Sequence, residues 1–97
     1  MDKNKLRYAI LKLRDEKKNP FIELKGQVPE EDILEQTKFL SRNGLLESMV
    51  WADNTVHIWG SVSLEGEKYL VENSGLAKAY ALAKEVKVKM IKILCQH

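Results

Sequence analysis

The side chains that could perform covalent or acid–base chemistry are few in this chain and far apart in its sequence. Cys95 belongs to no histidine and asparagine constellation that would activate a thiol, and His57 and His97 are widely separated. The acidic run at residues 30–32 is explained by a helix start, where carboxylates complement the positive end of the dipole. Because the sequence contains no phosphate loop, metal-ligand spacing or nucleophile elbow, we predict no enzyme, cofactor, metal site or small-molecule substrate.

Basic side chains suggest a different chemistry, which is the neutralisation of phosphates. The chain has 16 basic and 14 acidic residues, a net charge of +2 that is too balanced to imply nucleic acid by itself. Seven basic and three acidic residues give residues 1–18 a net charge of +4, and five basic and one acidic residue give residues 76–97 the same value. The two ends would form a basic surface if they were neighbours. Ordinary solvated helix faces are the alternative interpretation.

Residues 30–43 bear most directly on DNA binding. They hold four acidic residues and two basic ones, Lys38 and Arg42, for a net charge of −2. Recognition helices usually enter the major groove with their N-terminal residues, so an acidic start would repel the DNA backbone there. If DNA is bound, we expect groove contact from Lys38 and Arg42, with phosphate contacts from Lys5, Arg7 and Lys12.

Aromatic residues provide an alternative site. Trp51, His57 and Trp59 lie on or beside two expected strands, and an outward-facing set would form a patch typical of protein interfaces. The tryptophans could instead cover the core from the inner side of a hairpin.

Length and composition indicate one domain over residues 1–97. The apolar fraction is 44% and the charged fraction 31%, as in globular proteins. A single cysteine permits no disulfide within the chain, which suits a reducing compartment. We expect a cytoplasmic protein, because the sequence has no signal-peptide pattern and no apolar run long enough to span a membrane.

Three helices are indicated before residue 75. The first spans residues 3–18, with an apolar stripe that ends before Asn19-Pro20. Residues 30–43 predict the second, which begins after Pro29 and ends at Asn43-Gly44. Ser63 is the expected N-cap of the third, over residues 64–72. Residues 21–27 are too short to separate a helical turn from a strand.

Strands and a last helix complete the pattern. Residues 45–51 and 55–59 are rich in β-branched and aromatic residues, and Ala52-Asp53-Asn54 between them predicts an antiparallel hairpin. Apolar residues at helical spacing predict a last helix over residues 76–94. The order predicts an α+β fold of the winged helix-turn-helix type, with a two-stranded wing and an added C-terminal helix.

The sequence resembles the YjcQ family, which comprises small winged-helix proteins of Gram-positive bacteria and their phages and prophages. The resemblance covers nearly the whole chain and depends on the order and spacing of five stretches, at residues 6–12, 39–44, 57–59, 64–70 and 78–80. It implies a winged-helix fold and a phage or prophage association. The family is largely uncharacterised, so the resemblance implies no biochemical role. Gln36 and Thr37 are polar where such helices usually carry apolar core residues.

Two functions therefore stay open. The first is double-stranded DNA binding with a regulatory role, by analogy with the fold. The second is a protein-interaction or dimerisation module without DNA binding, in which another protein or a second copy binds. The expected C-terminal helix is long for so small a domain, and its wide apolar stripe predicts a homodimer through that helix.

Overall fold

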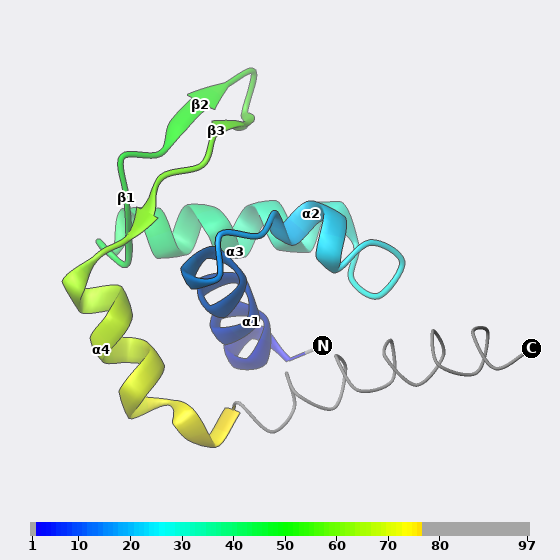
Figure 1. Ribbon diagram of the computed structural model, residues 1–97. Helices are drawn as coiled ribbons and strands as arrows, with labels where there is room; N and C mark the ends of the chain where they lie inside the picture. Colours follow the sequence, from blue (N-terminus) through cyan, green and yellow to red (C-terminus); the bar gives the residue numbers. More distant parts are fainter. Residues whose placement is uncertain (1, 77–97) are drawn as a thin grey trace, which may run out of the picture.

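Helices pack against one another and an antiparallel hairpin stands away from them in the computed structural model, which describes residues 2–76 (Figure 1). This α+β arrangement is compatible with a winged helix. The helices are α1 (Lys3–Asp15), α2 (Pro20–Glu23), α3 (Glu30–Arg42) and α4 (Leu64–Glu72), followed by the 3₁₀ turn η1 (Ser74–Leu76). The helix predicted over residues 76–94 lies outside the described residues, except for Leu76. None of the helices in residues 2–76 has both the length and the apolar composition that crossing a bilayer requires.

Helix α1 is the centre of the core, and the predicted stripe of Leu6, Ala9, Ile10 and Leu13 is buried. Leu11 is buried as well, because α2, α3, α4 and the hairpin root all pack around this helix. The helix ends at Asp15 rather than at residue 18. Lys17 has φ of 61°, its N–H donates to the Arg14 carbonyl, and the Lys18 N–H donates to the Leu13 carbonyl. This is a Schellman motif with lysine at the position that glycine usually occupies.

The ambiguous stretch after α1 forms a helical turn. The side chain of Asn19 accepts a hydrogen bond from the Phe21 N–H at 2.9 Å, and Pro20 occupies the first turn of α2. Leu24 is buried beyond it.

Helix α3 buries one face, and that face includes the two polar positions Gln36 and Thr37. Ile33 and Leu40 are buried together with Thr37, whose hydroxyl donates to the Ile33 carbonyl at 2.7 Å. Gly44 has φ of 74° just after the helix, so the predicted stop at this position is confirmed.

The predicted antiparallel hairpin is present, but its strands are interrupted. Its root is β1 (Leu46–Glu47) paired with β4 (Ser61–Val62), and its tip is β2 (Val50–Ala52) paired with β3 (Thr55–Ile58). Ser48 has φ of 61° and divides the first predicted strand. Asp53 and Asn54 both have positive φ, which is the backbone of a two-residue type I′ turn.

Two small residues hold the hairpin root and α4 in place. A Cβ atom on Gly60 would lie 1.7 Å from the Glu47 carbonyl oxygen, so the two strands of the root approach closely only because this residue is glycine. The Ser63 hydroxyl donates to the Gly44 carbonyl and accepts from the Gly66 N–H, which confirms Ser63 as the N-cap of α4.

Candidate nucleic-acid interface

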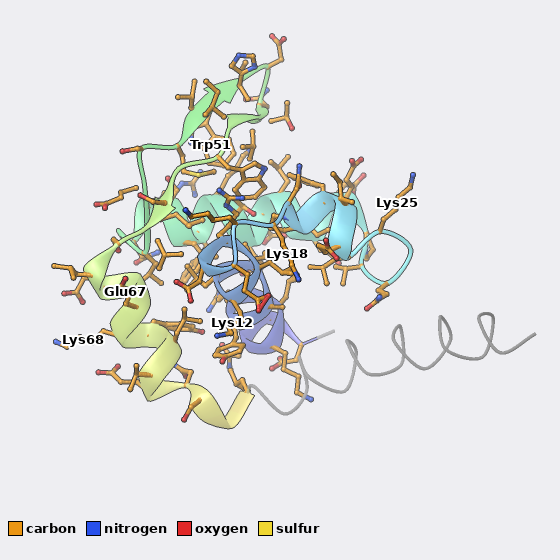
Figure 2. The ribbon with its side chains drawn as sticks, viewed as in Figure 1. Lys12, Lys18, Lys25, Trp51, Glu67 and Lys68 are labelled. Atoms are coloured by element: carbon orange, nitrogen blue, oxygen red, sulfur yellow. The ribbon has the colours of Figure 1, made fainter. Side chains whose placement is uncertain are left out.

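An open groove of about 460 Å³ separates the C-terminal half of α3 from the tip of the hairpin. Helical spacing places Lys38, Ser41 and Arg42 along one side of it. The hairpin forms the other side with residues 51–54, and Trp51 lies on the hairpin near α3 (Figure 2). The structure therefore brings together both residues predicted to enter a DNA groove and one of the three residues predicted for a protein-binding patch.

The groove contains more positive than negative charge. Lys38 is half-buried and Arg42 is exposed, and neither side chain is paired with a carboxylate within residues 2–76. Asp53 is the acidic residue in the lining. Two hydrogen-bonding side chains, Ser41 and Asn54, lie among these charges. The cations, the hydroxyl and the amide are side chains of the kinds that contact a phosphate backbone.

The acidic first turn of α3 lies at the opposite end of the helix from Arg42. Asp32 precedes Arg42 by ten residues, which corresponds to about 15 Å along a helix axis. This separation exceeds the screening length of about 8 Å at physiological ionic strength. Glu35 is closer, since it is exposed and precedes Lys38 by three residues. The sequence-based objection to DNA binding therefore applies to the start and middle of α3 more than to Arg42 at its end.

The three α1 residues predicted as phosphate contacts, Lys5, Arg7 and Lys12, lie outside this groove. The guanidinium of Arg7 donates to the Gln36 side chain at 2.7 Å and stacks 3.6 Å above the Phe39 ring, so it holds α1 against α3. Lys12 lines a different groove, between α1 and α4. Lys5 is exposed on α1. Their assignment as phosphate contacts stays a prediction.

Trp59 and Trp51 have different surroundings. The Trp59 ring lies 5.8 Å from the Phe21 ring, and the Arg14 guanidinium lies 5.3 Å from it. Trp59 thus covers the core at the hairpin root, as the inner-side interpretation predicts. His57 is exposed on β3.

Arg14 is a site-positioning residue that the sequence did not reveal. Its guanidinium donates to the Lys18 carbonyl at 2.9 Å and to the Gly60 carbonyl at 3.2 Å, which ties the end of α1 to the hairpin root. Burial lowers the pKa of this guanidinium. The sequence signal is only a basic residue in the last turn of a helix, which the negative end of the helix dipole would also favour.

Fold and groove together define a small α+β protein in which a helix end and a hairpin flank a basic groove. The chain matches no family model and no solved structure. It is 37% identical over 90 residues to the uncharacterized protein YjcQ of Bacillus subtilis (strain 168), and the match covers 90% of this chain and 96% of that protein. The chain belongs to the YjcQ family, as the resemblance predicted.

Proposed function

We propose that this protein is a winged helix that binds double-stranded DNA through the groove between α3 and the hairpin. The observation that carries the proposal is the pair of cations, Lys38 and Arg42, facing Trp51 across an open groove with no carboxylate partner among residues 2–76. Ion pairing with phosphates releases condensed counterions and is the main source of affinity in such complexes.

The proposed docking uses the end of α3 rather than its start. The usual winged-helix and helix-turn-helix geometry presents the N-terminal residues of the recognition helix to the bases, and here Glu30, Glu31 and Asp32 occupy that turn. Contact from the C-terminal half of α3 and the hairpin keeps this acidic turn away from the backbone. Arg42 is exposed and carries the fork of donors that pairs with guanine, which would supply the base contact that a regulatory role needs.

Fluorescence anisotropy of a short random-sequence duplex at low salt tests the proposal. We expect saturable binding, since non-specific dissociation constants are about 10⁻⁴ to 10⁻⁶ M even at physiological salt. The double variant K38A/R42A should bind much more weakly. The matched control K25A/K68A removes the same charge from two exposed lysines far from the hairpin tip, one beyond α2 and one on α4 (Figure 2). Absence of binding by the wild type at about 100 µM protein would overturn the proposal.

A protein-interaction module is the second candidate, and an apolar pair on the hairpin favours it. Val50 and Ile58 pair across β2 and β3 and are 44% and 55% exposed, with His57 exposed beside them. This candidate predicts self-association in light scattering at two protein concentrations, weakened by V50K/I58K, and no affinity for duplex DNA. The homodimer predicted through the C-terminal helix concerns residues outside 2–76 and stays a prediction.

A further inference from the structure

Helix α4 has a second face with two large apolar residues and Lys68 between them, and nothing in residues 2–76 covers the apolar pair. Its core side carries Gly66, Tyr69 and Leu70, whereas Leu64 and Val71 on the opposite side are 82% and 75% exposed. These two residues are seven positions apart, so they share one face and lie about 10 Å apart along the axis. Exposed large apolar residues that repeat along a helix indicate a binding surface.

A groove borders this face and extends the surface toward α1. It is lined by Val71 and Leu70 from α4 and by Tyr8 and Lys12 from α1, with Ser74 at the end of the described chain. The apolar face and the groove meet at Val71. Figure 1 shows α4 running from the hairpin root away from the hairpin tip, so this surface is separate from the proposed DNA site at the tip.

Charge indicates what the surface binds. Helix α4 has three glutamates and one lysine, a net charge of −2, and the charges of Lys12 and Asp15 beside it in the groove cancel. Residues 77–97 have five lysines and one glutamate, a net charge of +4. The last part of the chain is therefore electrostatically complementary to α4. Its apolar residues recur at helical spacing, at positions 80, 83, 86, 90 and 93.

The described chain ends where this surface begins. Residues 73–76 have the length of the connection of about two to five residues that joins two antiparallel helices, and Ser74 itself lines the groove. A covalently attached segment has an effective concentration of about 1 mM at its own binding surface. This value exceeds any ordinary concentration of a second copy.

We propose that residues 77–97 fold back onto their own chain and dock on this surface, covering Leu64 and Val71 and pairing their lysines with the glutamates of α4. The proposal does not depend on DNA binding.

Paramagnetic relaxation in the full-length chain tests this docking. A nitroxide is attached at Lys84→Cys in a Cys95→Ser background, and amide signals are recorded on ¹⁵N-labelled, spin-labelled protein diluted into unlabelled protein, so that only effects within one chain are seen. We expect strong broadening of the amides of α4 and much weaker broadening at the hairpin tip. The variant L64K/V71K should greatly weaken the broadening at the start of α4, the part of the helix farthest along the chain from the label. Its substitutions lie at highly exposed positions, so the variant is expected to fold.

The matched control V50K/I58K places two lysines on the exposed apolar pair of the hairpin and should leave the broadening unchanged. A second mixture, in which spin-labelled ¹⁴N protein is added to ¹⁵N protein without a label, detects contacts between chains. Broadening of α4 in this mixture alone would mean that a second copy occupies the surface and would overturn the proposal. Absence of α4 broadening in the first mixture, or its persistence at the start of α4 in L64K/V71K, would overturn it as well.

Discussion

The salt dependence of DNA binding by K38A/R42A can be calculated from the number of cations in the α3–hairpin groove. Affinity falls as salt rises, and each phosphate contact makes the slope of log affinity against log salt more negative by about 0.9. Lys38 and Arg42 both line the groove, so their removal should make the slope less negative by about 1.8. Taking the electrostatic contribution as zero at 1 M salt, the same relation gives an affinity loss of about 200-fold at 50 mM and about 20-fold at 200 mM.

Anisotropy titrations of the wild type, K38A/R42A and the control K25A/K68A across this salt range measure the three slopes. We expect the affinity loss in K38A/R42A to shrink as salt rises. K25A/K68A should retain a slope close to that of the wild type, because Lys25 and Lys68 lie away from the groove. Equal slopes for K38A/R42A and the control would refute the assignment of the contacts to this groove.

Three further predictions concern the elements that position the groove, each read as a free energy of unfolding in urea. Gly60→Ala should cost about 3 kcal/mol or more, because the added Cβ meets the Glu47 carbonyl; Gly75→Ala, with open space around it, is the control and should cost far less. Ser63→Ala should lower the free energy of unfolding by about 1–2 kcal/mol, because it removes the α4 cap and the hydrogen bond to the Gly44 carbonyl. An equal loss in the control Ser61→Ala, at an exposed position, would contradict this explanation. Arg14→Lys should cost about 1–3 kcal/mol, since lysine keeps the charge but lacks the fork that reaches two carbonyls; an unchanged stability would remove Arg14 as the link to the hairpin root.

Local patterns in the sequence predicted the elements whose causes are local. The apolar stripe of α1, the stop at Gly44, the turn at Asp53-Asn54 and the cap at Ser63 all depend on residues a few positions apart. The end of α1 was placed too late because Lys17 adopts a positive φ that is unusual for lysine. The division of the first strand at Ser48 was missed for the same reason.

Contacts between distant residues were not predictable in this way. Arg7 reaches Gln36 across 29 positions, and Arg14 reaches Gly60 across 46. In the sequence, each of these arginines looks like an ordinary solvent-exposed basic residue. Its partner is identified only once the helices are packed together. The two polar positions in α3 become explicable at the same stage, since Gln36 receives the Arg7 hydrogen bond and Thr37 bonds within its own helix.

The candidate site was predicted in its parts but not in its assembly. Lys38 and Arg42 were selected from their place on an expected recognition helix, whereas Trp51 was assigned to a competing protein-binding patch. The structure places Trp51 beside the two cations and separates it from Trp59, which packs on Phe21. Two tryptophans eight positions apart on one hairpin therefore have different surroundings, because one lies at its tip and the other at its root.

Trp51 fluorescence offers the most direct measurement of DNA docking in the α3–hairpin groove. In a W59F background Trp51 is the single remaining tryptophan, so its emission reports on the groove alone. Docking there predicts a saturable change in this emission during titration with duplex DNA, with the same midpoint as the anisotropy of the duplex. Unchanged Trp51 emission while the anisotropy shows saturation would place the DNA elsewhere and contradict the proposed site.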